Sequence, residues 1–489
     1  MEFPSALSPR ARALDMATVA LLGAALWITL IGGGRYLLFD VVISLRSPMV
    51  FLYGAASVAI VRHLLWPRPT ILTRARHVYA SIFARADLAA AIRAFAATRP
   101  AVLLVGFFAV ITFGLSDNAG FTPSTDPLAN LPARFDAGWY AGVALDGYTW
   151  DHTFQRQRNI AFFPAMPMLM RPLAMVFGLH DRSASYDRRM LRALWAGVVI
   201  SLAAFLWALV YVVRLGREMI GAERAAAAAL LLASYPFALF FSAPYTESLF
   251  LLAAVGAFFH FRRREWLAAS AWGLAAGLTR PNGCFLSAPL GILAIQQIYF
   301  DSGALPERAP NSGESKDSRS GIVQAWGIPL LTAAMPGIGM LLFTGYLYGL
   351  TGVWFAWARS HEAWGRTYQG WGPFVTAFGR LRDEPFLQVV TNNPYNTINA
   401  LGVLFALALT YPVFRRFGAA FGVFVLINLV PPLFAGGVLS MGRLSSTLFP
   451  LFLALAAVVP PRSVPAWVAG FGIGQGLCAA LFFTWRELF

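Results

Sequence analysis

Long apolar segments, each long enough to cross a lipid bilayer, recur along the whole chain. A membrane-spanning helix needs about 20 mostly apolar residues, and its backbone polar groups must be satisfied within the segment. Of the 489 residues, 58% are hydrophobic and 12% are charged, whereas a soluble domain has about 25% charged residues. The sequence therefore predicts an all-α, polytopic integral membrane protein with about 13 spans. The predicted spans are 16–38, 47–66, 100–115, 192–213, 225–242, 246–261, 265–279, 284–300, 327–350, 395–413, 418–436, 444–460 and 465–485.

Arginine clusters predict which side of the membrane each end of a span faces. Positive charge gathers on cytoplasmic loops, so the arginines that follow spans 192–213 and 246–261 are placed in the cytoplasm. Segments 116–187 and 351–394 then lie outside the cell. The apolar stretch 160–178, which three prolines interrupt, is then expected to lie in the outer interface rather than to cross the membrane.

Two parts are predicted along the chain. Residues 1–98 contain two spans and a basic, amphipathic segment at 67–98, bordered by Arg62 and Arg99, which we expect on the cytoplasmic surface. Residues 99–489 form the main transmembrane domain. Within it, residues 301–324 are rich in Ser, Gly, Asp and Glu without helical periodicity, which predicts a flexible cytoplasmic loop.

Charge and cysteine usage exclude several classes of function. The net charge of +15 would suit a nucleic-acid partner in a soluble protein, but no known nucleic-acid-binding motif is present, so none is expected. Cys284 and Cys478 lie in apolar runs and are expected to be small buried hydrophobes, not a disulfide or a metal pair. The sequence has no zinc-ligand spacing, Walker sequence or dinucleotide-binding motif.

A polar, aromatic loop between the spans holds the first candidate site. Asp136, Trp139 and Tyr140 share one face if this stretch is helical. Aromatic rings can stack on sugar rings, and a carboxylate beside them could deprotonate an acceptor hydroxyl. The alternative is that Asp136 caps an interfacial helix and the two aromatic residues belong to the interfacial belt. Asp146 follows ten residues later, and Phe163 could line a lipid groove or anchor the interface.

Cations at outer span ends form a second candidate set. Arg280, Arg366 and Arg443 could bind a lipid phosphate, because arginine offers two parallel hydrogen bonds. Any one of them could instead extend to lipid headgroups. His361 and Trp364 could contact the same headgroup or simply belong to the interface.

Glu247 opens a predicted span directly after Thr246. Its carboxylate could support the site. A carboxylate at a helix N-terminus also interacts favourably with the helix dipole, and this second explanation is equally compatible with the sequence.

Several motifs, in this order, resemble those of PIG-V-like mannosyltransferases, bacterial relatives of the second mannosyltransferase of glycosylphosphatidylinositol-anchor synthesis. The motifs are FDAGWY at 135–140, DGY at 146–148, AFFP at 161–164, SAPYTESLF at 242–250, LTRPNG at 278–283 and SMGR at 440–443. The resemblance covers residues 100–460. It implies a GT-C helical bundle with a large extracytoplasmic first loop that contains interfacial helices. It also implies inverting transfer from a polyprenyl- or dolichyl-phosphate sugar.

The resemblance assigns roles to particular residues. The family's loop acid corresponds to Asp136, and its Tyr-Thr-Glu stretch includes Glu247. The chain departs from the family in having Phe135 where tryptophan is usual, and no second acid adjoins Asp136. Asp146 or Asp151 could replace that acid, or a single base could suffice.

The sequence thus predicts a bacterial inner-membrane glycosyltransferase, most simply a mannosyltransferase, whose active site faces outward. Its expected partners are a polyprenyl-phosphate sugar donor, a glycan, lipid or protein acceptor, and membrane lipids. No metal is required, because the lipid phosphate leaves as a stable anion, but Mg²⁺ or Mn²⁺ near Asp136 is left open. The rival is a transporter or flippase, which would place charges mid-span. The predicted site residues are Asp136, Asp146 and Glu247 for catalysis, Arg280, Arg366, Arg443, His361 and Trp364 for the donor phosphate or lipid, and Trp139, Tyr140, Phe163, Tyr245 and Asn282 for the sugar or groove.

Overall fold

The computed structural model describes residues 9–31, 34–38, 41–45, 47–66, 85–179, 181, 183–303, 326–365 and 367–488. Most of the predicted basic segment 67–98, most of the predicted loop 301–324 and the predicted site residue Arg366 lie outside these residues.

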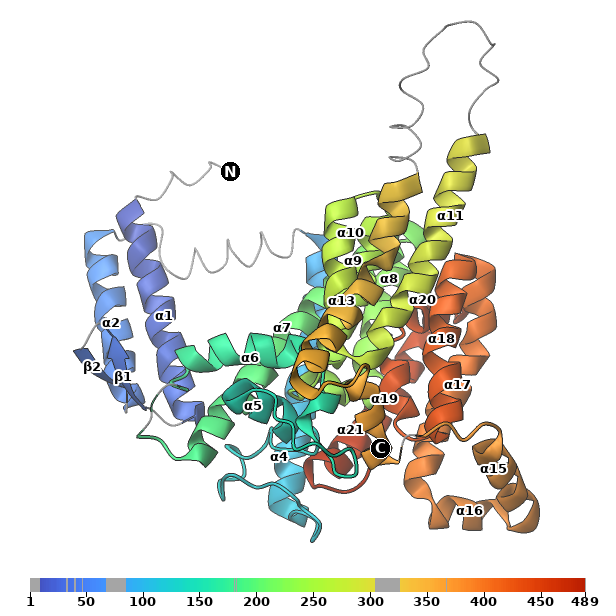
Figure 1. Cartoon of the computed structure of the whole chain (residues 1–489). Helices are drawn as coiled ribbons and strands as arrows, with labels where there is room; N and C mark the ends of the chain where they lie inside the picture. The colour runs from blue at the N-terminus through green and yellow to red at the C-terminus, as the bar shows by residue number, and fades with distance from the viewer. Residues whose placement is uncertain are drawn as a thin grey trace, which may run out of the picture.

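The described chain is built from helices joined by short connections, with one small β-hairpin (Figure 1). The α-helices are α1 Pro9–Ile31, α2 Pro48–Leu65, α4 Ala86–Phe113, α5 Ala137–Asp146, α6 Ala165–Val176, α7 Tyr186–Ile220, α8 Ala222–Ser234, α9 Glu247–Arg262, α10 Trp266–Thr279, α11 Ser287–Gly303, α13 Ile328–Thr351, α14 Ala356–Ser360, α15 Gly372–Asp383, α16 Phe386–Asn392, α17 Pro394–Phe417, α18 Ala419–Gly436, α19 Met441–Ser446, α20 Phe449–Val458 and α21 Val464–Phe483. The 3-10 helices are η1 Asn159–Ala161, η2 Pro236–Ser242, η3 Pro281–Leu286, η5 His361–Trp364 and η6 Pro461–Ser463. Strands β1 Gly34–Leu38 and β2 Val41–Leu45 pair antiparallel, with Gly34 opposite Leu45.

The prediction of a polytopic helical membrane protein is confirmed. Within the described residues, 7 helices are long and apolar enough to cross a membrane, or 8 if α8 and η2 form one bent span. The sequence predicted more spans because an apolar window does not reveal where a helix ends. Predicted spans 246–261, 265–279 and 284–300 are the shorter helices α9, α10 and α11, of 16, 14 and 17 residues. Predicted span 16–38 ends as a helix at Ile31, and β1 follows.

The predicted span 225–242 is not one continuous helix, because the chain turns by 81° between α8 and η2. Pro236 begins η2, and proline cannot continue the hydrogen bonding of a preceding helix. Arg99 of α4 satisfies the carbonyl groups that this break exposes, since its guanidinium donates to the oxygens of Ala233 and Ala238. Arg99 is 1% exposed, so it is a buried structural group and not part of a cytoplasmic basic surface.

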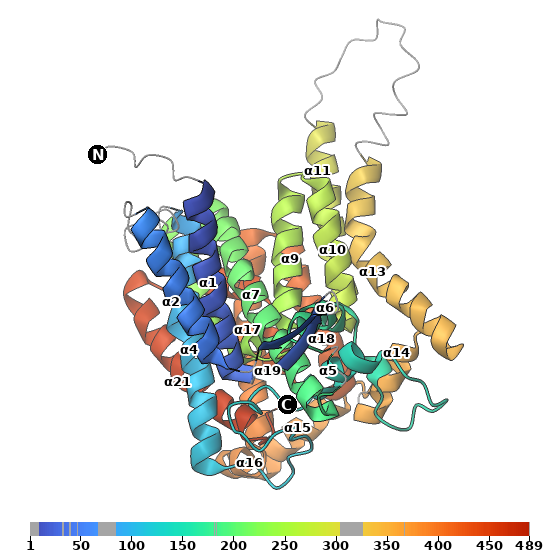
Figure 2. The ribbon, with the colours of Figure 1, turned by 90° about the vertical axis from the view of Figure 1, so that its left-hand side faces the viewer.

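The long connection between α4 and α7 carries α5, η1 and α6 across one end of the bundle (Figures 1 and 2). In Figure 1, α6 lies crosswise to the long helices, and its 12 residues are too few for a span. This arrangement is consistent with the prediction that 160–178 does not cross the membrane. Helices α14, α15 and α16 lie at the same end of the molecule (Figure 2).

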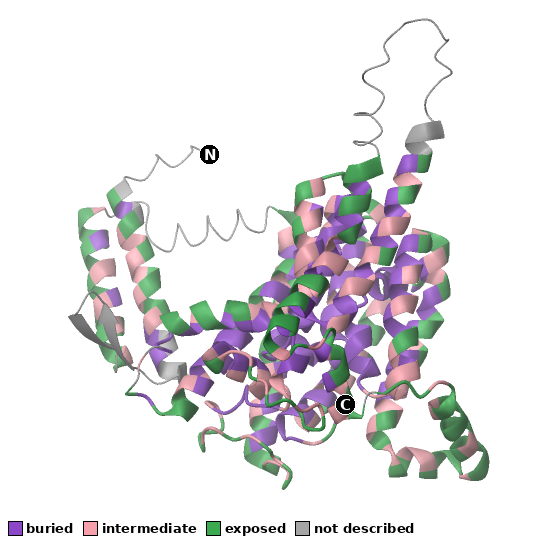
Figure 3. Cartoon of the chain, viewed as in Figure 1, coloured by how far each residue is buried: buried purple, intermediate pink, exposed green. Residues whose placement is uncertain are grey.

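Burial is concentrated in α7, α8, α9 and α20, in the middle of the bundle (Figure 3). Helix α10 packs against α13 through small residues, since Gly277 and Gly339 face backbone oxygen atoms of the opposing helix. A Cβ atom on Gly277 would overlap the carbonyl oxygen of Pro336 in α13. Such close approach is typical of membrane helices, whose association depends on van der Waals packing. It fixes the position of η3, which directly follows α10.

We expect Gly277→Ala to lower the melting temperature of the detergent-solubilised protein, because the added methyl group would push α10 away from α13. Overpacking of this kind costs about 1–3 kcal/mol. The matched control is Gly345→Ala in α13, where a Cβ atom meets nothing within 4 Å. The control should melt at or slightly above the wild-type temperature, and equal melting of both variants would contradict the close packing.

Candidate active site

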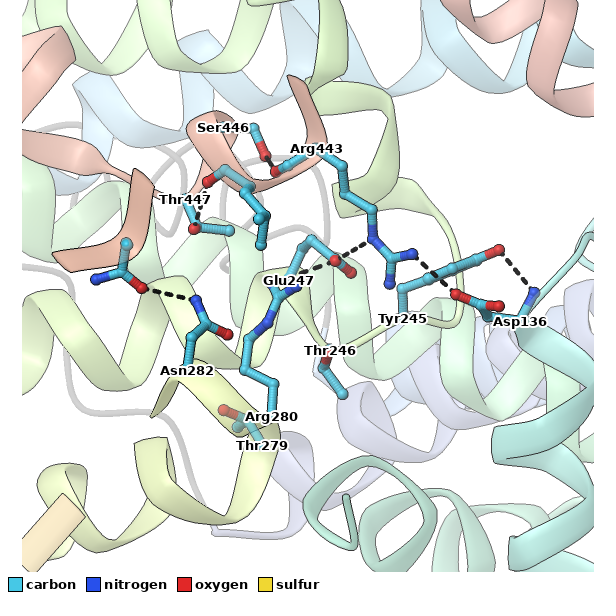
Figure 4. Close-up of polar contacts among 12 residues, drawn as sticks. Asp136, Tyr245, Thr246, Glu247, Thr279, Arg280, Asn282, Arg443, Ser446 and Thr447 are labelled. Atoms are coloured by element: carbon cyan, nitrogen blue, oxygen red, sulfur yellow. Dashed lines mark hydrogen bonds and ion pairs between the residues drawn. The ribbon is translucent and has the colours of Figure 1, made fainter. Parts of the chain in front are cut away.

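An arginine near the C-terminus joins two carboxylates from distant parts of the chain (Figure 4). The Nε atom of Arg443, in α19, donates to Oε1 of Glu247, and its Nη1 atom donates to Oδ2 of Asp136 at 2.9 Å. The guanidinium also lies over the rings of Tyr245 and Phe240, with its Cζ atom 4.5 and 5.3 Å from the ring centroids. One side chain therefore links the loop before α5, the start of α9 and α19.

Glu247 is the most deeply buried of these charges, with 0% of its side chain exposed. Its Oε1 atom accepts from Arg443 and lies 3.3 Å from Nη1 of Arg280. A buried carboxylate requires such partners, because desolvation of an isolated charge is very costly. Asp136, Arg443, Glu247 and Arg280 thus form a chain of alternating charge with no net formal charge.

The local backbone aims Asp136 away from its own helix. Asp136 precedes α5, but within the described part of the chain its carboxylate makes no capping hydrogen bond, so the capping alternative is not supported. Its backbone N–H donates to the hydroxyl of Tyr245 at 3.1 Å, and that hydroxyl donates to the carbonyl of Arg134 at 3.0 Å. Phe135 has a φ of 44°, which is uncommon for a bulky residue and reverses the chain just before Asp136.

These residues border a cavity of about 1050 Å³. Its polar wall includes Asp136, Thr246, Arg280, Asn282, His361 and Arg443, its aromatic wall includes Trp139, Phe162, Phe163, Trp357 and Trp364, and its apolar wall includes Phe285, Pro431, Pro432, Ala435 and Leu439. Among the described residues that line the cavity, only Asp136 carries a carboxylate, and 24% of its side chain is exposed. Glu247 does not line the cavity but contacts Arg280 and Arg443, which do.

The aromatic wall is a packed cluster. Trp139 stacks on Phe162 at 5.7 Å between centroids, and Trp364 presents an edge to Trp139 at 6.0 Å. Tyr140 packs edge-on against Phe162, and its hydroxyl lies 3.5 Å from Oγ1 of Thr246. Burial raises the pKa of the Tyr140 phenol to about 12. Tyr140 is therefore a neutral hydroxyl at physiological pH and not a base.

The structure does not bring Asp146 to this cavity. Asp146 is the last residue of α5, and Asp136 precedes the first, so they lie about 15 Å apart along the axis at the normal rise of a helix. Asp146 instead accepts a hydrogen bond from the hydroxyl of Tyr186 at 2.8 Å. Asp151, the other candidate for a second acid, pairs with Arg158 in the loop. Neither is a second acid beside Asp136.

Some of the remaining predicted residues line the cavity, and others hold the neighbouring segments in place. Trp139, Tyr140, Phe163, His361 and Trp364 line the cavity, as does Asn282. The side-chain amide of Asn282 also donates to Asn428 of α18 at 2.7 Å, which ties η3 to α18. Tyr245 is 0% exposed and supports the loop instead of contacting a ligand.

Sequence reasoning missed two supporting groups. Arg134 is fully buried, and its guanidinium donates to the carbonyl groups of Asn130, Ala133 and Phe483. It therefore fixes the loop next to Asp136 against the end of α21. The Pro431–Pro432 pair inside α18 forms part of the apolar wall. Adjacent prolines in a predicted span were a usable signal, whereas nothing in the sequence distinguishes Arg134 from a surface arginine.

The metal ion considered near Asp136 does not fit the described residues. They contain no group of three or more His, Cys, Asp or Glu side chains that could hold a metal ion. The nearest charged group to Asp136 is the Arg443 guanidinium, which would repel a divalent cation.

Comparison with known proteins gives one family match. Residues 125–352, which include Asp136, Glu247 and Arg280, match the family model described as Mannosyltransferase (PIG-V). The helical membrane fold and this match support a membrane glycosyltransferase, rather than the transporter considered from the sequence. Residues 125–352 are therefore similar to the PIG-V mannosyltransferases, the family that the motifs resemble.

Among solved structures, the chain is similar to the Archaeoglobus fulgidus oligosaccharyltransferase crystallised with Zn and sulfate. The two share 13% sequence identity with a TM-score of 0.40, and the match covers 79% of this chain and 53% of that chain. The chain thus spans about half the length of that protein. No curated protein matches the chain significantly.

We expect Glu247→Gln to destabilise the protein strongly, because it leaves Arg280 without its carboxylate and weakens the pairing of Arg443. Removing one partner of a buried ion pair costs about 3–5 kcal/mol. Thermal unfolding in detergent measures this loss. Glu362→Gln, a change at an exposed glutamate, is the control and should melt like the wild type. A Glu247→Gln protein that melts with the control would contradict the buried network.

Proposed function

We propose that this protein transfers mannose from a polyprenyl-phosphate donor to an acceptor hydroxyl, with inversion at the sugar C1 atom, and that Asp136 is the general base. One observation carries the proposal: Asp136 supplies the only carboxylate among the described residues lining the cavity, and two arginines, Arg280 and Arg443, line the same cavity. The family match supports mannose as the sugar.

The transfer is a single displacement. The acceptor oxygen attacks C1 of the mannose on the face opposite the phosphate, and its proton passes to the Asp136 carboxylate. The bond between C1 and the phosphate oxygen breaks, and its electron pair leaves with the polyprenyl phosphate. A correctly placed base contributes about 10²–10⁴-fold to the rate of such a step.

The alternating charges suit the movement of charge in this reaction. Before transfer, Arg443 neutralises Asp136 through the 2.9 Å contact. After the proton arrives, Asp136 is neutral while the leaving phosphate has gained one negative charge. Arg443, freed from part of its pairing, and Arg280 beside it can then stabilise that phosphate, because donors aimed at developing charge are most effective in a site shielded from water.

Glu247 would act in this reaction as a positioning residue. It contacts both arginines and no part of the cavity. Its buried charge fixes the two guanidinium groups where the donor phosphate would lie. The apolar wall from Phe285 to Pro431 and Leu439 would accommodate the first isoprene units of the lipid.

We further propose that the protein lies in a bacterial inner membrane with this cavity on the outer face. The predicted cytoplasmic arginines include Arg217 and Arg262, in the last turns of α7 and α9. These helix ends lie opposite the end of the bundle that carries α5 and α14 (Figures 1 and 2). A lipid-linked donor reaches a cavity at that depth without leaving the bilayer.

Asp136→Asn should reduce transfer from a radiolabelled polyprenyl-phosphate mannose by ~10²–10⁴-fold, because asparagine keeps the shape but cannot accept the proton. Asp146→Asn is the matched control at the other end of α5 and should retain near-normal transfer. Thermal unfolding establishes that both variants are folded. Equal activity of the two variants would remove Asp136 from the role of base.

Arg280→Lys should raise the KM for the same donor by about tenfold, because lysine keeps the charge but loses the two parallel hydrogen bonds to phosphate. The KM for the acceptor should stay unchanged. Arg171→Lys, at an exposed arginine of α6, is the control. An unchanged donor KM in Arg280→Lys would show that the phosphate binds elsewhere.

A further inference from the structure

A second, smaller cavity lies beside the catalytic one. Its volume is about 560 Å³, and its lining comes from the loop between α5 and η1 and from the segment that contains α14 and η5. The first side contributes residues 152–155, and the second contributes Arg359, Glu362 and Ala363. We call this space the outer cavity.

One stretch of chain separates the two cavities. Along residues 357–364, Trp357, His361 and Trp364 line the catalytic cavity, whereas Arg359 and Glu362 line the outer cavity. The loop between α5 and η1 also borders both cavities. Gln157 lines the catalytic cavity, and Gln155 lines the outer cavity. A ligand in the outer cavity is therefore a short distance from the aromatic wall of the active site.

The lining of the outer cavity suits hydroxyl groups rather than a lipid chain. His152, Gln155, Arg359 and Glu362 supply an imidazole, an amide, a guanidinium and a carboxylate, and all four residues are exposed. Phe154 is not a free apolar surface, since the Cζ atom of Arg359 lies 4.7 Å above its ring. Such a mixture of neutral and charged donors and acceptors can bond many hydroxyls at once.

The loop that forms one side is held in place. Asp151 pairs with Arg158 across the loop, and Trp150 packs on Phe154 with 4.7 Å between ring centroids. The Asn159 side chain donates to the carbonyl of Gly147 at 3.0 Å, which closes the base of the loop. The polar groups of the outer cavity are thus presented on an ordered support.

We propose that the outer cavity binds the inner sugars of a glycan acceptor while the terminal sugar reaches past the 357–364 segment to Asp136. This inference rests on the proposed transfer reaction and names the acceptor class. A volume of about 560 Å³ lies within the range of pockets that enclose small molecules, about 300–1,000 Å³. A lipid acceptor would leave the charged lining unpaired, which is unfavourable.

The test uses the purified full-length chain, radiolabelled polyprenyl-phosphate mannose, and methyl glycosides of one, two and three mannose residues as acceptors. In the wild type, the acceptor KM should fall at least about tenfold from the monosaccharide to the trisaccharide, as the added sugars form hydrogen bonds. Arg359→Ala and Glu362→Gln should each abolish most of that gain while leaving kcat for the monosaccharide and the donor KM unchanged. Arg156→Ala, at an exposed arginine of the same loop that lines neither cavity, should behave like the wild type.

Each outcome is decisive. If the acceptor KM still falls from the monosaccharide to the trisaccharide in both variants, the outer cavity is not the glycan subsite. The proposed transfer reaction would be unaffected by that result. Transfer that occurs only to a peptide or lipid fraction of membranes, and not to the glycosides, would overturn the glycan class. If the donor is not consumed with any acceptor or membrane fraction, the proposed function itself is wrong. The same assay separates this result from the others, because it measures donor consumption directly.

Discussion

The pairing of Arg443 with two carboxylates is the interaction on which this active site depends. Charges buried in a membrane protein need partners, and removing one partner is far more costly than removing a surface pair. Arg443 meets Glu247 at the start of α9 and Asp136 beside α5, so a single guanidinium sets the distance between a loop and the bundle. Much of the surrounding structure, including the buried Arg134, keeps those two anchor points in place.

The chemistry of the site was easier to predict from the sequence than its geometry. Asp136, Arg280 and Arg443 were identified because charges and aromatic residues at span ends are costly and therefore informative. Their convergence in one cavity was only an expectation from topology, and the direct bond between Arg443 and Asp136 was not foreseen. A sequence pattern cannot reveal this bond, because a contact between residues 307 positions apart depends on the packing of every helix between them.

The errors have equally specific physical causes. Asp146 was grouped with Asp136 because it follows ten residues later in the same polar, aromatic loop, but a ten-residue helix carries its two ends to different surroundings. The span predicted at 225–242 was broken by Pro236, and the arginine that compensates for the break, Arg99, lies on another helix. Hydropathy measures how apolar a segment is, but it does not report which backbone groups need an external donor.

The order of these residues along the chain has a consequence for biosynthesis. Glu247 can pair with Arg280 soon after both are made, because only the two short helices α9 and α10 lie between them. Asp136 pairs with Arg443, which emerges from the ribosome only after most of the bundle. Until Arg443 is made, the loop that carries Asp136 lacks the ion pair that links it to α19. Arg443 thus supplies a late contact that completes the active site after α9 and α10 have been made.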